Sequence, residues 1–254
     1  MLLVPSSSGL GHLVFSQRIR GSNPLGITYM NKISSAITDI EKKWLNLLYE
    51  YCKKEFSKVN LASHDHTHHR RVWNYAKQIF IELESIGYKV NVNNIEKSII
   101  AIFFHDVGLT RTINEIGHGV ESRKLCSQFF RQNLLKTPEN FEEVLKAIEK
   151  HDDKEYKSIV YSKKLNRDNI MSILCVSDDL DAFGELGTLR YAEIYLLRDN
   201  NLKTLPERVI KNLDKRFQNF LAVYGDLKNL VKKQKKRYLL TKQFYINIRK
   251  EINV

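Results

Sequence analysis

The stretch NIEKSIIAIFFHDVG, residues 94–108, decides the fold. Its first part, residues 94–104, is apolar on nearly every side, which is typical of a helix buried at the centre of a bundle. His105 and Asp106 follow directly on this apolar run. A carboxylate there is costly to bury unless it is paired or binds a cation, and the neighbouring imidazole offers a nitrogen donor for the same cation. The stretch therefore predicts a central helix that ends at a pair of metal ligands.

Helical periodicity continues on both sides of this central stretch. Glycine and proline number only 11 and 4 in 254 residues, whereas sheet-rich folds need many turn residues. The sequence Thr-Pro-Glu at 137–139 predicts a helix start, and another helix is expected to begin near Asp168. Amphipathic stripes indicate further helices over about 33–51, 72–83, 141–148, 186–198 and 207–250. No alternating strand pattern persists, so we expect an all-α protein.

Two features of the sequence favour a cytoplasmic protein. No run of about 18 apolar residues occurs, so no membrane span is expected. The three cysteines, Cys52, Cys126 and Cys175, lie far apart, which argues against a disulfide scaffold and for a reducing compartment.

The two ends of the chain differ in composition from its middle. Residues 203–254 contain 14 Lys and Arg against 4 Asp and Glu, so most of the net charge of +12 lies there. Residues 1–29 contain no acidic residue and show no helical period, and Gly-Ser-Asn-Pro at 21–24 matches one reading frame of a common transfer-RNA arm. We interpret residues 1–29 as a disordered or spurious upstream segment with Met30 as the true start, or alternatively as an organelle transit peptide.

Further histidines and aspartates lie on inward faces of other helices. Asp178 and Asp181 continue one buried apolar stripe, and His151 continues another. Each has an ordinary explanation: a single inward histidine is usually a satisfied core residue, Asp181 can pair with an arginine, and the histidine-rich tract 64–69 can be a surface metal binder. Several such groups on separate helices are hard to explain as independent accidents. Convergence of inward His and Asp is how helical bundles build metal sites.

The order His, His-Asp, Asp resembles the HD superfamily of metal-dependent phosphohydrolases. The resemblance covers about residues 40–250 and implies an HD-domain helical bundle over residues 30–200. It also implies basic C-terminal helices over residues 201–254, packed on that bundle or extending it. The matching segments are SHDHTHHRRV (63–72), HDVG (105–108), SDDLDAFG (177–184) and IKNLDKRFQNF (210–220).

The resemblance implies His68, His105, Asp106 and Asp178 as metal ligands, with Asp106 and Asp178 also catalytic by holding the attacking water. His64 lies on a family histidine outside the ligand position. The chain also departs from the family pattern. The first aspartate of one motif is replaced by valine at position 176, and Leu109 and Thr110 stand where some relatives carry a water-activating glutamate. A general base is therefore not expected at that position.

Other residues are candidates for binding the substrate phosphate. The resemblance implies accessory roles for His118 and His151, which bind either a second metal or a substrate phosphate. Arg111 and Arg123 follow the central helix and can supply positive charge to a phosphoryl group. Arg71, one helical turn after His68, either does the same or clamps a buried carboxylate.

The expected function is hydrolysis of a phosphoester or phosphoanhydride in a small phosphorylated molecule, with a nucleotide as the expected substrate. Mixed imidazole and carboxylate ligands suit Mn²⁺, which we expect, and also Fe²⁺, Co²⁺, Ni²⁺ or Zn²⁺, with Mg²⁺ less favoured. The alternative function is a non-catalytic nucleic-acid-binding helical protein with a vestigial HD core. That alternative rests on the basic C-terminal helices and their interleaved aromatic residues.

Overall fold

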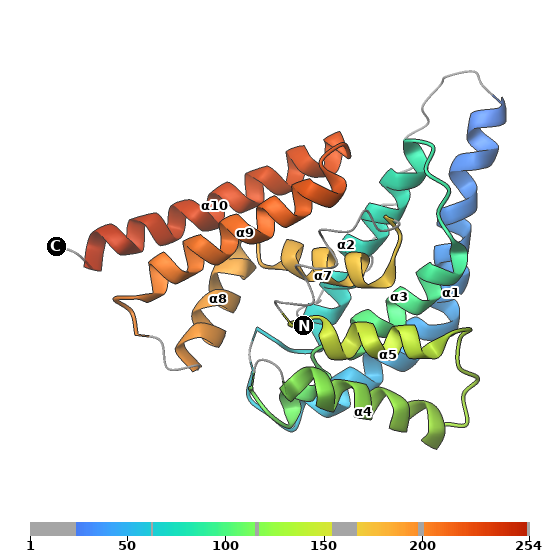
Figure 1. Cartoon of the computed structure of the whole chain (residues 1–254), viewed down its shortest axis with the longest axis horizontal. Coiled ribbons are helices and arrows are strands. Elements are labelled where there is room, and N and C mark those ends of the chain that lie inside the picture. The colour runs from blue at the N-terminus through green and yellow to red at the C-terminus, as the bar shows by residue number, and fades with distance from the viewer. Residues whose placement is uncertain (1–23, 62, 115–116, 154–166, 198–200, 253–254) are drawn as a thin grey trace, which may run out of the picture.

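The computed structural model describes residues 24–61, 63–114, 117–153, 167–197 and 201–252. These residues form nine α helices and one 3-10 helix and contain no strand, which confirms the all-α class (Figure 1). In chain order the elements are α1 (Pro24–Phe56), α2 (His66–Ser85), α3 (Val92–Phe104), η1 (Val107–Thr110), α4 (Gly117–Gln132), α5 (Phe141–Lys150), α7 (Ile170–Asp181), α8 (Glu185–Leu197), α9 (Leu205–Tyr224) and α10 (Lys228–Ile252).

Helix α3 is the centre of the bundle, as its apolar sequence predicts. It packs against α1, α2, α5 and α7. Its side chains are buried on all sides, because the successive residues Ile99, Ile100, Ala101 and Ile102 are each fully buried although they point about 100° apart around the helix. Each such side chain contributes about 1.5–3 kcal/mol when it is removed from water. The position of His105 at the end of α3 is therefore fixed by the core itself.

Helix α7 is the second buried helix of the bundle, and every residue from Ile170 to Asp181 is buried. It packs against α2, α3, α5 and α9. The helix begins at Ile170 because the side chain of Asn169 caps it by accepting the Met171 N–H. Asp168, near which the sequence predicted the helix start, does not cap the helix; its carboxylate accepts the Asn91 N–H at 2.7 Å instead.

The start of α5 differs from the prediction. The helix begins at Phe141, four residues after the expected cap at Thr137. Asn140 adopts a left-handed backbone conformation (φ 52°, ψ 46°), which interrupts any helix that Pro138 could have started. The predicted inward stripe is nevertheless present, with Val144 and Ile148 fully buried.

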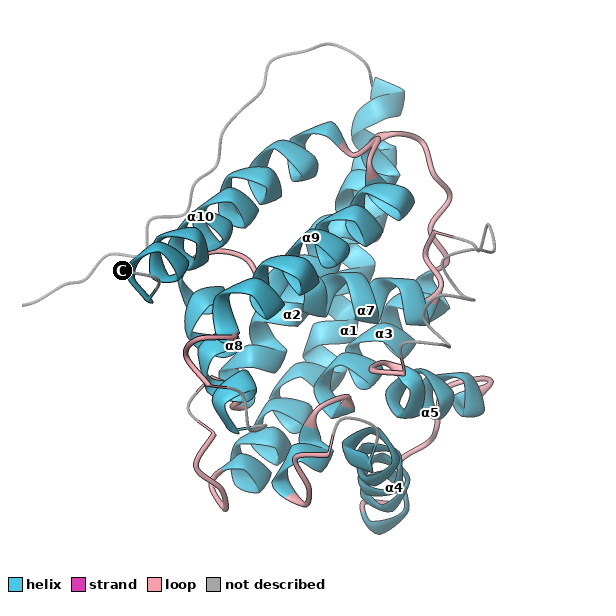
Figure 2. Ribbon diagram, turned by 60° about the vertical axis from the view of Figure 1, so that its left-hand side comes forward, coloured by secondary structure: helices cyan, strands magenta, loops and turns pink. Residues whose placement is uncertain are grey.

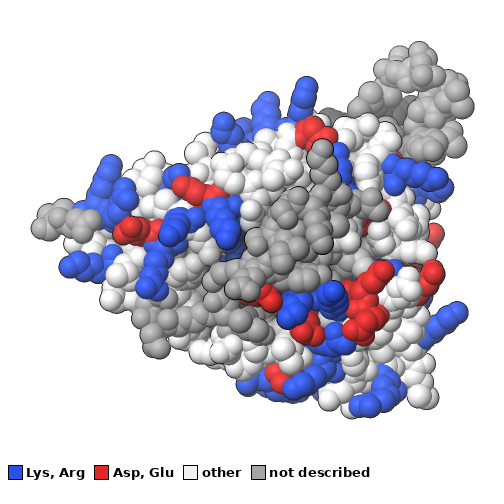
Figure 3. Space-filling view, viewed as in Figure 1, with Lys and Arg blue, Asp and Glu red and all other residues white. Residues whose placement is uncertain are grey.

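Helices α9 and α10 lie side by side on one flank of the molecule (Figures 1 and 2). The predicted helical stretch 207–250 is divided, because α9 ends at Tyr224 and α10 begins at Lys228. Figure 3 shows lysine and arginine side chains over this flank, with acidic side chains among them. Several aromatic residues of these helices face inward, since Phe220, Tyr224 and Tyr245 are buried in the core, whereas Phe244 is 44% exposed.

The N-terminal helix begins earlier than the periodicity indicates. Helix α1 begins at Pro24, so residues 24–29 of the expected upstream segment are helical, while residues 1–23 lie outside the described part of the chain. The domain boundaries remain predictions. Within the described ranges, no helix has the length and apolar character needed to cross a membrane. The three cysteines are free and buried.

Candidate metal centre

The end of α3 is shaped to present His105 and Asp106 together. His105 caps the helix, and its Nδ1 lies 2.7 Å from the carbonyl oxygen of Ile102. Asp106 then leaves the helical conformation (φ −105°, ψ 1°). The hydroxyl of Ser122 holds this turn by donating to the His105 carbonyl at 2.7 Å and accepting the Gly108 N–H at 2.8 Å. The two side chains can therefore face one space although they are adjacent in sequence.

The structure brings together the four residues that the resemblance implies as metal ligands. The Nε2 atoms of His68 and His105 lie 3.2 Å apart. Asp106 Oδ2 lies 3.4 Å from Nε2 of His68 and 3.3 Å from Nε2 of His105. Asp178 Oδ1 lies 3.5 Å and 3.9 Å from the same two nitrogens. All four residues are buried, and we call them the first donor set.

A second donor set lies on the other oxygen of Asp106. Asp106 Oδ1 is 3.1 Å from Nε2 of His151 and 3.3 Å from Nε2 of His118. These two nitrogens are 3.1 Å apart. Asp152 Oδ2 is 3.7 Å from Nε2 of His118, and His118, His151 and Asp152 form a group with metal-ligand spacing. Asp106 thus faces one donor set with each of its carboxylate oxygens.

All four histidines of the two sets turn the same nitrogen inward. A backbone carbonyl or a carboxylate can only accept a hydrogen bond, so Nδ1 carries the proton, and in the neutral ring the lone pair lies on Nε2. Four converging Nε2 lone pairs next to carboxylates fit a divalent cation. The Nδ1 partners are Asp181 Oδ2 for His68 (2.9 Å), the Ile102 carbonyl for His105 (2.7 Å), the Asn114 carbonyl for His118 (3.0 Å) and the Ile148 carbonyl for His151 (2.7 Å).

The close approach of imidazoles and carboxylates in the two donor sets shifts the pKa values of Asp106 and His118. Burial tends to raise the pKa of Asp106, but His105 and the hydrogen bonds from His118 and His151 outweigh it and hold that pKa well below its usual range. Burial lowers the pKa of His118, but its hydrogen bond to Asp106 and the charges of Asp106 and Asp152 raise it to about 9. The cluster therefore keeps its carboxylate charged, and His118 holds a proton in place of a cation.

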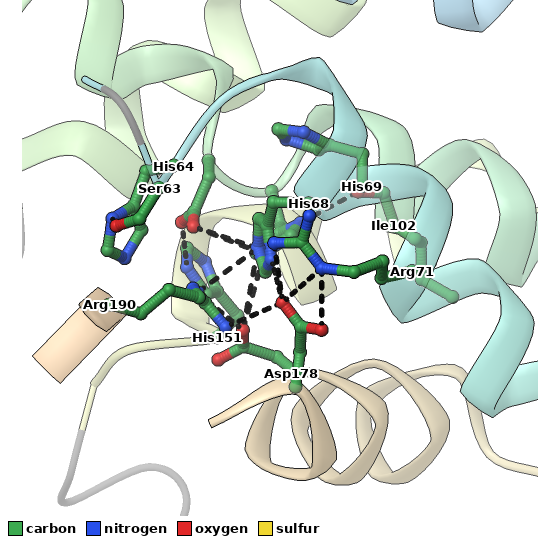
Figure 4. A network of polar contacts seen from close by, with 12 residues as sticks. Ser63, His64, His68, His69, Arg71, Ile102, His151, Asp178 and Arg190 are labelled. Carbon is green, nitrogen blue, oxygen red and sulfur yellow. Dashed lines mark hydrogen bonds and ion pairs between the residues drawn. The ribbon is translucent and has the colours of Figure 1, made fainter. Parts of the chain in front are cut away.

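Asp181 contacts His68 of the first donor set and is itself held by two arginines. Figure 4 shows these arginines, Arg71 and Arg190, pointing toward His68 from two sides. Arg71 Nε donates to Asp181 Oδ1 at 2.9 Å, and Arg190 Nη1 donates to Asp181 Oδ2 at 3.0 Å. Of the two roles considered for Arg71, binding of the substrate phosphate or clamping of a buried carboxylate, the contact with Asp181 corresponds to the second. Asp181 in turn contacts His68.

Arg111 and Arg123 are engaged by glutamates. Arg111 Nη2 lies 2.8 Å from Glu55 Oε2. Arg123 lies 2.6 Å from Glu142 and 3.1 Å from Glu149, so it ties α4 to α5. Among the described residues, neither guanidinium has a recorded contact with the two donor sets.

The histidine-rich tract at the start of α2 is mostly interior. His64 and His69 are buried like His68, so the tract is not a surface metal binder. His64 Nδ1 lies 3.1 Å from Glu193 Oε2, and burial together with the charge of Arg190 lowers the pKa of His64 to about 4. His69 Nδ1 contacts the carbonyl of Asp65 at 3.2 Å.

The sequence analysis did not identify Asp152, Arg190 and Arg216 as site residues. Each of them has a position in its helix that could have suggested an interior role. Asp152 follows a helix-capping histidine, just as Asp106 follows His105. Arg190 lies on the buried face of α8. Arg216 lies one position before a buried aromatic residue of α9, and its Nη1 contacts Asp178 at 3.3 Å and Asp179 at 2.8 Å.

Comparison with known proteins identifies the family. The model of the HD domain family matches residues 66–215, a range that includes both donor sets. No curated protein and no solved structure matches the chain. Since the family match covers more than half of the 254 residues, the protein belongs to the HD domain family, the superfamily of metal-dependent phosphohydrolases that its sequence resembles.

Proposed function

We propose that the protein is a phosphohydrolase whose two donor sets would each hold a divalent cation, with Asp106 contributing to both sets. The observation that carries this proposal is the position of Asp106. Its Oδ2 lies within 3.4 Å of two imidazole nitrogens, and its Oδ1 lies within 3.3 Å of two others. A carboxylate shared in this way is the usual bridge of a two-metal hydrolytic site.

The donor atoms favour manganese or a similar ion. Two imidazoles in each set disfavour Mg²⁺, which prefers oxygen ligands, while Mn²⁺, Fe²⁺, Co²⁺, Ni²⁺ and Zn²⁺ accept mixed donors. When bound, such an ion lowers the pKa of a coordinated water from 15.7 toward about 7 and polarises the phosphoryl group.

The residues of the chain orient the water and the substrate. Asp106 and Asp178 are ionised, because the neighbouring histidines and arginines hold both pKa values well below the usual range against the effect of burial. Their oxygens can therefore accept a hydrogen bond from the attacking water and fix its direction. The surrounding apolar helices keep bulk water away, which strengthens each electrostatic contact in the site.

The proposed substrate is a small phosphorylated molecule, most specifically a nucleotide. Members of the family act on many phosphate compounds, so the substrate class rests on the resemblance and on the site chemistry together. The three buried free thiols favour the cytoplasm as the place of this activity.

The test is a hydrolysis screen of the purified full chain. Nucleoside mono-, di- and triphosphates and cyclic nucleotides are each offered with Mn²⁺, Mg²⁺, Ni²⁺ or Zn²⁺, and released phosphate and pyrophosphate are measured separately. We expect metal-dependent release that stops on adding a chelator. Unchanged release in metal-free buffer with chelator would reject the proposal.

The aromatic residues of the C-terminal helices give little support to the alternative, binding of nucleic acid without catalysis. Phe220, Tyr224 and Tyr245, which could have stacked on bases, are buried, while Phe244 on α10 is 44% exposed. Lys242 is paired with Asp214 at 2.8 Å. A steep loss of oligonucleotide affinity with added salt, in a protein without metal-dependent hydrolysis, would favour that alternative.

A further inference from the structure

Arg190 brings a buried positive charge to the first donor set (Figure 4). Its side chain, from α8, is only 8% exposed, and Nη1 donates to Asp181 as described above. Its Nη2 lies 3.4 Å from Asp178 Oδ1 and 3.4 Å from His68 Nε2. Its Nε has no hydrogen-bond partner among the described residues. A buried charged donor without an acceptor is costly, so this guanidinium has donor capacity that the protein leaves unused.

The contacts of Arg190 Nη2 are with atoms that the proposed cation also needs. Asp178 Oδ1 and His68 Nε2 both belong to the first donor set. The single lone pair of His68 Nε2 cannot serve both a cation and Nη2, so Nη2 would lose that contact and share Asp178 Oδ1 with the cation. Two positive groups would then compete for the same buried acceptors. Like charges repel strongly in such a low-dielectric space. An anion that contacts both positive groups removes the conflict.

Arg216, the other arginine that contacts Asp178, is already satisfied. Arg216 donates to Asp178 and Asp179, and its Nε donates to Asn212 at 2.9 Å. Its side chain is 22% exposed, compared with 8% for Arg190. Arg216 therefore holds the carboxylates in place, while Arg190 combines an unpartnered Nε with an Nη2 that contacts two atoms of the first donor set.

A phosphate group has the right chemistry for this position. It offers several oxygens, so one can bind a cation while another accepts from the planar guanidinium, which suits phosphate better than an ammonium group does. We propose that Arg190 binds a phosphate oxygen of the substrate and that Asp181, through Nη1, holds the guanidinium in position. This inference rests on the proposed function and places the phosphate-binding arginine on α8, instead of at Arg111 or Arg123.

The test measures binding of inorganic phosphate and of Mn²⁺ separately, by calorimetry on the full chain. Arg190→Met and Arg190→Lys are compared with wild type, and Arg123→Met is the control because its guanidinium is also engaged in two ion pairs, with Glu142 and Glu149. We expect Arg190→Met to weaken phosphate binding to the Mn²⁺-loaded protein by about ten- to a hundredfold. Its Mn²⁺ affinity should stay equal or rise, since a neighbouring positive charge is removed. A merely structural role for Arg190 would lower both affinities.

The outcomes separate the two levels of the proposal. If Arg190→Met binds phosphate as tightly as wild type, or if Arg123→Met shows the loss instead, the role of Arg190 is overturned and the two-metal site stands. If wild type takes up neither Mn²⁺ nor any of Fe²⁺, Co²⁺, Ni²⁺ and Zn²⁺, the proposed function itself fails. If Arg190→Met loses its helical circular dichroism signal, Arg190→Lys provides the test instead, because lysine keeps the positive charge but lacks the planar guanidinium with its paired N–H donors. We expect several-fold weaker phosphate binding there, and equal binding overturns the inference.

Discussion

Asp181 Oδ2 lies 2.9 Å from Nδ1 of His68, which directs Nε2 of that imidazole into the first donor set. Both side chains are almost completely buried. A carboxylate behind a metal-binding histidine fixes the tautomer and the orientation of the ring and raises the basicity of the ligand. His68 is therefore ready to bind a cation before the cation arrives.

Replacing Asp181 by asparagine should weaken cation binding by about ten- to a hundredfold, because the amide can donate to Nδ1 and favour the wrong tautomer of His68. Equilibrium dialysis with Mn²⁺ measures the change. Asp214→Asn is the control, since Asp214 also pairs with a cation, Lys242, but on the surface between α9 and α10. Equal Mn²⁺ affinity in the two variants would contradict a positioning role for Asp181.

Replacing Asp106 by alanine should remove both cations and all hydrolysis, because both donor sets share this carboxylate. His118→Ala should remove only the cation of the second set. Metal analysis after gel filtration should therefore give two ions for wild type, one for His118→Ala and none for Asp106→Ala.

The helical circular dichroism signal of Asp106→Ala should remain largely intact, because the core packs around α3 and not around the carboxylate. One ion retained by Asp106→Ala would show that the two sites are independent of this bridge.

The metal-free protein should lose stability as pH rises from about 6.5 to about 9 through the titration of His118. The folded-state pKa of His118 is raised from 6.5 to about 9, so its contribution is fully present below pH 6.5 and is lost as pH rises through 9. Urea unfolding in chelator at pH 6 and pH 9.5 measures this, and the difference between wild type and His118→Asn isolates the one residue.

Cation binding should show the opposite dependence on pH, because the cation must displace the proton of His118. Below pH 9, affinity for the second cation should fall by about tenfold per pH unit. A pH-independent affinity between pH 7 and 9 would mean that His118 does not bind the cation.

Replacing Gly108 by alanine should destabilise the fold by at least about 1–3 kcal/mol. A Cβ at this position would lie 2.0 Å from the carbonyl oxygen of His118 and 2.7 Å from the backbone nitrogen of Ser122, so η1 and α4 would have to separate. Urea unfolding measures the change in the free energy of unfolding.

Gly117→Ala is the matched control for Gly108→Ala. Its nearest neighbours are atoms of the Asn114 side chain at 3.3 Å, which can shift more easily than backbone. Equal losses of stability in the two variants would show that the contact at Gly108 is not the cause.

The sequence predicted correctly those features of the fold that depend only on residues close together in the chain. Helical period and apolar content are properties of neighbouring residues, so they predicted the all-α class, the central position of α3 and the inward direction of His151 and Asp178. The end of α3 at the His105-Asp106 pair was predictable for the same reason. The start of α5 was not, because it depends on the left-handed backbone of a single residue, Asn140.

The arrangement of the site required the packed structure. Arg190 lies 122 positions from His68 in the chain, and Arg216 lies 38 positions from Asp178. Whether two such side chains meet depends on the angles and rotations at which whole helices pack, and neither periodicity nor spacing contains that information. The sequence alone was sufficient to name the four residues of the first donor set together with His118 and His151, but not Asp152, Arg190 or Arg216. Their division into two sets around Asp106 came from the packing of α2, α4, α5 and α7 around the central helix and η1. The approach of Arg190 and Arg216 to Asp178, in place of Arg111 and Arg123, came from the tertiary placement of α8 and α9.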